Sequence, residues 1–182
     1  MERLVDKHPN LVHLTSFRRE QFHSLLKRGQ LQEYHLDDPR FVKKANYDLK
    51  IATHEAGHIK GVFYVRGIFM GATISPSTTY AGATWSMMNP DKSGEQQAFD
   101  RMIVAALGES AERYSGEDNL RGASSDQGTE WYLAQTLSNR TLGIVSASTY
   151  WSNARSIANS IAYNGMSQIR ETAVDLYIRG SI

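Results

Sequence analysis

Apolar residues recur every three to four positions along most of this chain, which is the period of one buried face of an α-helix. Long segments with this period predict a mainly helical fold. The segments that carry it are 16–28, 39–64, 93–114, 124–140, 148–163 and 167–179.

Three of these segments have boundary signals. Asp38 precedes Pro39, and aspartate followed by proline at the first helical position is a common helix start. Ser93 is followed three residues later by Gln96, which is the capping-box pattern. Gly165 interrupts the last long periodic stretch, so we expect two separate helices there.

The pattern changes after Gly67 to two short runs typical of β-strands, at 68–75 and 80–87. The residues between them, 76–79, have the composition of a turn. We therefore expect a β-hairpin. The fold class is mainly α (α+β), with a small β-hairpin or sheet beside the helices.

The N-terminal residues 1–14 are polar and contain a turn signal at Pro9, so we expect a loosely ordered lead-in. At 182 residues the chain has the length of one ordinary domain. We expect a single domain over 1–182, with 1–40 as an N-terminal helical extension.

Composition excludes several classes of function. The hydrophobic fraction of 41% and the charged fraction of 21% are those of a globular protein. A net charge of +1 gives no basic footprint for nucleic acid. No apolar run is long enough to span a bilayer. No phosphate-binding loop of the P-loop type is present, so we expect no nucleotide.

The chain contains no cysteine, so any bound metal must use histidine and carboxylate ligands. A chain without cysteine also fits a reducing compartment, and we expect a cytoplasmic protein.

The sequence His54-Glu55-Ala56-Gly57-His58 has the H-E-x-x-H spacing of zinc-protease helices. Residues four apart lie on one face of a helix, so the two imidazoles can bind one Zn²⁺. Glu55 lies beside the metal and suits a general base acting on a water molecule there. Gly57 is expected to let a neighbouring backbone pack close to this helix.

Catalytic zinc sites use three protein ligands, and position alone leaves the third one open. Glu109 and Glu112, near the end of the 93–114 helix, are both candidates. His8 and His13 are further candidates, although lone histidines in a polar segment are usually solvated.

Four blocks of residues together resemble the peptidase domain of the FtsH family of ATP-dependent zinc metalloproteases. The resemblance covers about 49–131, and the order and spacing of the blocks are those of the family. The blocks are His54-Glu55-Ala56-Gly57-His58; Ala72-Thr73-Ile74-Ser75-Pro76 with Gly82-Ala83-Thr84; Leu107-Gly108 with Ala111-Glu112 and Gly116; and Gly122-Ala123-Ser124-Ser125-Asp126.

The resemblance implies a helical, zincin-like peptidase fold and a site. It makes Asp126 the third zinc ligand and places Glu112 in the second shell, where it can hold a ligand histidine. Two positions differ from the family pattern. Gln127 follows the ligand aspartate where the family usually has leucine or isoleucine, and Leu107 replaces one glycine of a pair.

The resemblance also implies how substrate binds. The family pairs its substrate with an edge strand, which here corresponds to 81–85, so Gly82, Ala83 and Thr84 are the expected substrate-binding residues. Because this sequence has no counterpart of the family's ATPase module or membrane anchor, we expect ATP-independent hydrolysis of unfolded or partner-delivered polypeptides. A homo-oligomer and a separate unfoldase partner both stay open.

Two other functions stay open at this stage. One is a regulatory or binding protein that keeps the peptidase fold without turnover, although the intact Glu55 argues against it. The other is a zinc hydrolase of non-peptide substrates. A hairpin that only closes the core would favour the second, because only peptides pair with a strand.

Overall fold

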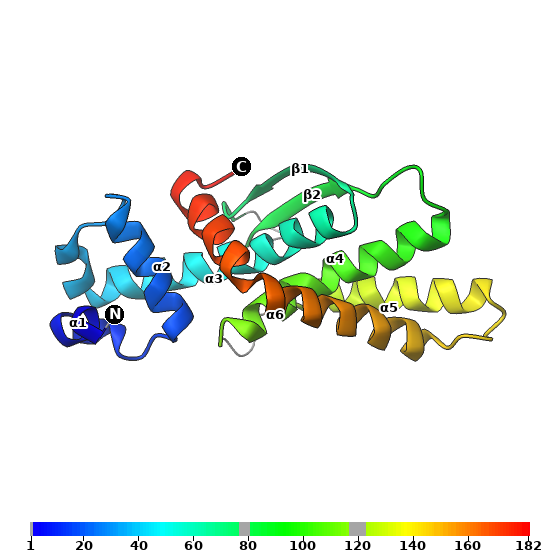
Figure 1. Cartoon of the computed structure of the whole chain (residues 1–182), viewed down its shortest axis with the longest axis horizontal. Helices are drawn as coiled ribbons and strands as arrows, with labels where there is room; N and C mark the ends of the chain where they lie inside the picture. Colours follow the sequence, from blue (N-terminus) through cyan, green and yellow to red (C-terminus); the bar gives the residue numbers. More distant parts are fainter. Residues whose placement is uncertain (1, 77–80, 117–122) are drawn as a thin grey trace.

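The computed structural model describes residues 2–76, 81–116 and 123–182, and within them the chain is mainly helical with one two-stranded sheet. Figure 1 shows an elongated molecule in which α3 and α6 run through the middle and the sheet covers one side of α3. The elements are α1 (Glu2–Lys7), η1 (Pro9–Leu11), α2 (Ser16–Lys27), η2 (Glu33–Asp37), α3 (Pro39–Tyr64), β1 (Ile68–Thr73), β2 (Ala83–Met87), α4 (Gly94–Tyr114), α5 (Ala123–Arg140) and α6 (Ala147–Arg179).

The two helices that carry most of the motif residues begin where their start signals predict. The Asp38 side chain accepts a hydrogen bond from the Arg40 amide at 2.8 Å and caps α3. Ser93 and Gln96 form the reciprocal capping box of α4, which satisfies backbone donors at the helix N-terminus. The mainly helical prediction is confirmed for these segments.

The break expected at Gly165 is wrong, because α6 is one continuous helix from Ala147 to Arg179. A glycine weakens a helix without ending it when packing holds the helix on both sides. Here Gly165 is buried, and an added Cβ would lie 3.1 Å from the Lys60 side chain of α3. The glycine therefore serves contact between two helices.

The loosely ordered lead-in is also wrong, because α1 and η1 occupy most of it. Leu11 is fully buried, and His8 is anchored by a contact of 2.8 Å between its Nδ1 and Asp37 Oδ1. A mostly polar segment is thus fixed by a few buried residues, which periodicity does not detect. The expected turn at 76–79 lies, apart from residue 76, outside the described residues.

β1 and β2 pair antiparallel, and the strands are shorter than the runs 68–75 and 80–87. The register pairs Ala72 with Thr84 and Thr73 with Ala83, and it shifts between Phe69 and Gly71. This shift is a β-bulge, which increases the local twist of a sheet.

The far edge of β1 is covered by residues 180–182. Ala72 exchanges two backbone hydrogen bonds with Ile182, of 2.8 and 2.9 Å, and the Ile74 amide donates to the Gly180 carbonyl. Within the described residues, β2 pairs only with β1, so its other edge is not covered by a strand.

Buried apolar residues form two clusters. The larger lies between α3, α4, α5, α6 and β1 and includes Ala56, Leu107 and Ala158. The smaller packs α2, η1 and η2 against the first half of α3 and the end of α6, with Phe22 and Val174 among its members.

Among the described helices, none has an apolar stretch of the length needed to cross a membrane.

Candidate metal centre

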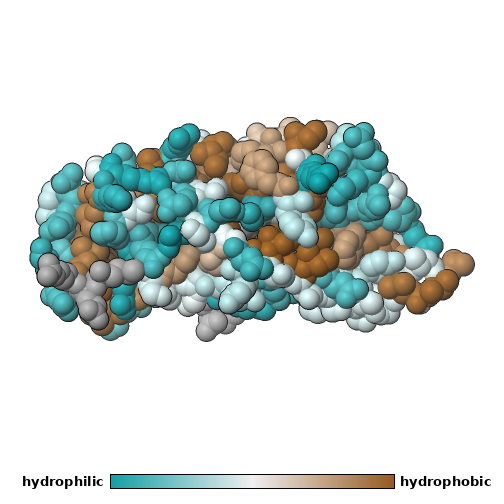
Figure 2. All heavy atoms as spheres, viewed as in Figure 1, coloured by the Kyte–Doolittle hydropathy of each residue, from teal (hydrophilic) through white to brown (hydrophobic). Residues whose placement is uncertain are grey.

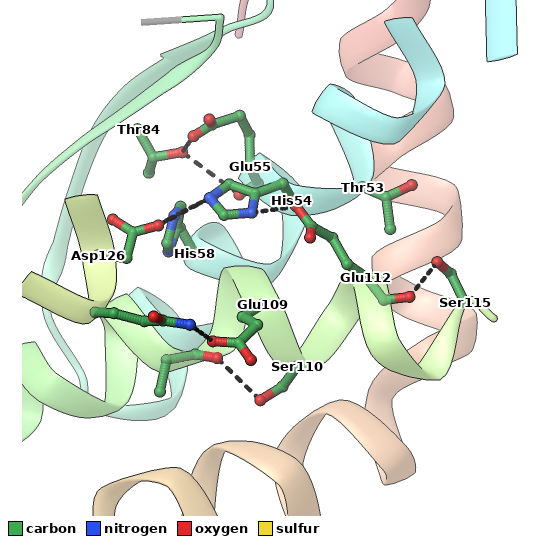
Figure 3. A network of polar contacts seen from close by, with 12 residues as sticks. Thr53, His54, Glu55, His58, Thr84, Glu109, Ser110, Glu112, Ser115 and Asp126 are labelled. Atoms are coloured by element: carbon green, nitrogen blue, oxygen red, sulfur yellow. Dashed lines mark hydrogen bonds and ion pairs between the residues drawn. The ribbon is translucent and has the colours of Figure 1, made fainter. Parts of the chain in front are cut away.

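Three predicted ligands come together from two helices. His54 and His58 lie one turn apart on α3, and Asp126 lies in the first turn of α5. The Asp126 Oδ2 atom is 3.0 Å from His54 Nε2 and 3.3 Å from His58 Nε2, and the two Nε2 atoms are 2.9 Å apart. Figure 3 shows the three side chains pointing toward one another.

These separations fit a shared metal ion. Two ligands about 2.0–2.1 Å from a tetrahedral ion lie about 3.3 Å apart, close to the distances found. One ligand atom from each residue falls within 4.8 Å of the others, which makes this the group of the described residues that can hold a metal.

The second ring nitrogen of each histidine has its own acceptor. His54 Nδ1 lies 2.6 Å from Glu112 Oε1, and His58 Nδ1 lies 2.8 Å from the Val104 carbonyl oxygen. Both acceptors belong to α4. They fix the rings with Nε2 toward Asp126, which is the arrangement that supports metal-binding histidines. Glu112 thus makes the contact with a histidine that the family resemblance implies, and the Val104 carbonyl gives no sequence signal because it is backbone.

Close packing of α4 on α3 brings these acceptors within reach. A Cβ added at Gly57 would lie 2.4 Å from the Leu107 carbonyl oxygen. A Cβ added at Gly108 would lie 2.7 Å from the Cε1 atoms of both His54 and His58. The close approach expected at Gly57 is confirmed, and Gly108 makes room for the two rings.

The cluster favours positive charge at its centre. Burial lowers the pKa of His54, but its contacts with Asp126 and Glu112 outweigh this and raise the pKa to about 10. Burial raises the pKa of Asp126, whereas the two histidines hold it well below its ordinary value. Two carboxylates around two imidazoles are therefore suited to bind a cation.

Glu55 lies beside this cluster and contacts the sheet. It is buried on α3, and the Thr84 hydroxyl of β2 donates to its Oε2 at 2.7 Å. A Cβ at Gly82 would lie 2.8 Å from Glu55 Oε1, so the glycine lets the backbone approach the carboxylate. The chain thus holds a carboxylate next to, but outside, the group of possible metal ligands.

The register shows which backbone groups of β2 point away from β1. Ala72 uses its N–H and C=O on Ile182, so Thr73 and Gly71 must face β2, because these groups alternate sides along a strand. Ala83 and Trp85 pair with them and face β1. The N–H and C=O of Thr84 therefore point to the open edge, whereas those of Ala83 do not.

The remaining candidates lie elsewhere. Glu109 forms ion pairs with Arg155 and Arg113 and accepts from Gln127 at 2.9 Å, and none of these partners belongs to the group that can hold a metal. The Gln127 side chain therefore donates to a carboxylate outside the group of possible metal ligands. His8 is held by Asp37, and His13 is exposed near the N-terminus.

Sequence reasoning missed this network around Arg155. Arg155 lies on α6, far along the chain from Glu109 and Glu130, and its guanidinium also lies 4.8 Å from the Trp151 ring centre. No local motif marks such a contact between helices.

A scan against family models and a search of curated proteins find no match for this chain.

Proposed function

We propose that this chain is a zinc-dependent metallopeptidase of the H-E-x-x-H type, related to the peptidase domain of the FtsH family. The observation that carries the proposal is the convergence of His54, His58 and Asp126, with Glu55 held beside them. In the proposal, these three residues hold Zn²⁺, while Glu112 and the Val104 carbonyl orient the two histidines.

Zinc bound there would lower the pKa of water and polarise a carbonyl group. Glu55 takes a proton from the attacking water and then delivers it to the amine that leaves. The Thr84 hydroxyl, 2.7 Å from Glu55 Oε2, orients the carboxylate and leaves Oε1 for the proton. Burial of Glu55 limits competing solvent, which supports directed proton transfer.

The substrate in this proposal is an extended polypeptide that adds to β2 as an antiparallel strand. Thr84 supports this, because its backbone groups point to the open edge while its side chain contacts Glu55. Pairing with Thr84 would place one peptide residue next to the base. Unfolded segments or chains delivered by a separate unfoldase are the substrates that fit such an edge.

Zinc analysis and a casein-type digestion assay test the function. The wild-type protein is expected to hold about one Zn²⁺ per chain and to cleave unfolded protein. Glu55→Gln should keep the metal and fold but lower kcat by at least about 100-fold, because the amide does not accept the proton.

Glu109→Gln is the matched control, since it neutralises a carboxylate of α4 that pairs with Arg155 and lies outside the metal group. It should keep most of the activity. Wild-type activity in Glu55→Gln, or none in metal-loaded wild-type protein, would refute the proposed function.

A further inference from the structure

The outer face of the hairpin carries a row of exposed apolar side chains. Figure 2 shows hydrophobic atoms gathered over the sheet at the top of the view. The exposed fraction of each is about half or more: Ile68 50%, Met70 63%, Trp85 46% and Met87 53%. Single exposed apolar residues are ordinary, but four on one small sheet face indicate a contact surface.

The pairing separates this face from the one that carries the chemistry. Thr84 points inward to Glu55, opposite the buried Ala72. Successive side chains of a strand alternate between the two faces of a sheet. Trp85 and Met87 therefore share the outer face, and Thr84 lies on the inner face. Consistent with this, a Cβ added at Gly71 would lie 3.9 Å from Trp85 Cε3.

Trp85 and Met87 lie on the strand with the open edge, and Ile68 and Met70 lie on the strand whose other edge residues 180–182 cover. An added strand would therefore run next to Trp85 and Met87 and be separated from Ile68 and Met70 by β2. Because the N–H and C=O of Trp85 face β1, the peptide residue opposite it is in a non-hydrogen-bonded pair. Side chains are closest in such pairs.

We propose that Trp85 and Met87 select substrates that carry apolar side chains at two alternate positions, on the N-terminal side of the cleaved bond. This inference rests on the peptidase function proposed above and identifies its substrate class. An antiparallel peptide runs against β2, so the residue opposite Met87 precedes the one opposite Trp85. The residue opposite Thr84 comes next and lies closest to Glu55.

The pairing geometry defines the sequence pattern of such a substrate. The peptide residues opposite Thr84 and Ser86 point inward. Those opposite Trp85 and Met87 lie on the apolar outer face. A substrate should show the pattern apolar–any–apolar–any, with cleavage next to the last position. Each cross-strand apolar pair strengthens binding up to about fivefold, so two pairs should lower KM about three- to tenfold.

Two extended reporter peptides test this, identical except for leucine or threonine at the two outer-face positions. Wild-type protein loaded with zinc should cleave the leucine peptide with a KM about three- to tenfold lower. A third peptide with the leucine pair shifted by one residue should lose the advantage, because its leucines face inward. Trp85→Thr combined with Met87→Thr should bring the ratio of the two KM values close to one.

Ile68→Thr combined with Met70→Thr is the matched control, since it also removes two exposed apolar side chains from the same face but from the other strand. It should keep the preference. A preference that survives loss of Trp85 and Met87, or is absent in the wild type, would overturn this inference and leave the peptidase proposal intact.

Peptide binding to metal-loaded Glu55→Gln, followed by fluorescence anisotropy, separates the two proposals. Absence of hydrolysis in the wild type would overturn the peptidase function. The same leucine preference in anisotropy, lost in the Trp85 and Met87 double variant, would still support selection by this face, and equal binding of both peptides would overturn it.

Discussion

Two largely buried polar clusters meet α5 one helical turn apart, and they differ in the partner of the α5 carboxylate. Asp126 faces the imidazoles of His54 and His58, whereas Glu130, four residues later, faces the guanidinium of Arg155 with Oε2 3.5 Å from Nη1. α4 contributes a second carboxylate to each cluster, Glu112 to the first and Glu109 to the second.

The difference shows what separates a candidate metal site from an internal ion pair. Arginine keeps its charge and offers only donors, so the Arg155 cluster contains its own cation. Histidine can release its proton and then offers a lone pair to a metal, so the Asp126 cluster can exchange a proton for a metal ion, which the Arg155 cluster cannot. Both clusters contain carboxylates from α4 and α5. Whether the partner is histidine or arginine determines whether the cluster can bind a metal ion.

The largest expected effect is a loss of zinc affinity when the carboxylate of the Asp126 cluster is removed, compared with removal of one from the Arg155 cluster. Asp126→Ala removes one of the three proposed ligands and should weaken zinc affinity by at least about 100-fold. Glu109→Ala should leave affinity within about threefold, because Arg155 and Gln127 hold that carboxylate away from the histidines. Competition titration with a zinc indicator measures both. Stoichiometric tight zinc in Asp126→Ala would show that the third ligand is another residue.

A smaller loss of zinc affinity is expected when Glu112, the acceptor for His54 Nδ1, is changed. Glu112→Gln keeps the shape of the side chain but removes the charge 2.6 Å from His54 Nδ1. Loss of such an outer partner typically weakens metal binding about 10- to 100-fold. Glu109→Gln, on the same helix, is the control. Equal zinc affinity in the two variants would mean that Glu112 does not support the site.

The Arg155 cluster should instead respond to pH. Burial raises the pKa of Glu130 to about 7, against the opposing effect of Arg155. Between about pH 4.5 and 7 the folded chain then holds a proton that the unfolded chain has lost. The contribution of Glu130 to the free energy of unfolding therefore falls as pH rises through this window and is constant above it.

Glu130→Gln should remove this dependence. The free energy of unfolding of the variant, relative to wild type, is expected to rise by up to about 3 kcal/mol from pH 5 to pH 8. Urea unfolding at a series of pH values, with metal held constant, measures it. Glu33→Gln, at an exposed glutamate, controls for loss of a charge. Parallel profiles for wild type and Glu130→Gln would contradict the prediction.

The smallest effect concerns a glycine between the two clusters. Gly128 is an exposed residue of α5 with nothing within 4 Å of an added Cβ. Gly128→Ala should raise the free energy of unfolding by about 0.5–1 kcal/mol and leave zinc affinity unchanged. Gly108→Ala, which would place Cβ 2.7 Å from both histidine rings, should weaken zinc binding. Thermal unfolding and zinc titration of both variants check the contrast.

The sequence predicts the parts of this site that depend on one helix. Caps at Asp38 and Ser93 and the four-residue spacing of His54 and His58 are local features. Local spacing did not choose between Glu109 and Glu112, because the choice depends on how α4 packs against α3 and α6. The resemblance to a known family, and not the spacing, singled out Asp126.

Features created by contact between distant segments were not predictable. The Val104 carbonyl accepts a hydrogen bond from His58, and every residue type has a backbone carbonyl, so the amino-acid sequence does not identify this acceptor. Gly165 resembles a helix end, yet packing against Lys60 keeps α6 continuous. The lead-in is ordered by single contacts, such as His8 with Asp37, which carry no periodic signal.

Residues 180–182, paired along β1, have a consequence for how molecules of this protein meet. An exposed strand edge is a template for self-association, and the hairpin has two edges. The pairing of Ala72 with Ile182 closes one of them, so two molecules that join through β2 have no further edge of the described sheet to extend from. Peeling these residues away would open the second edge and allow a two-molecule contact to grow into a chain of molecules.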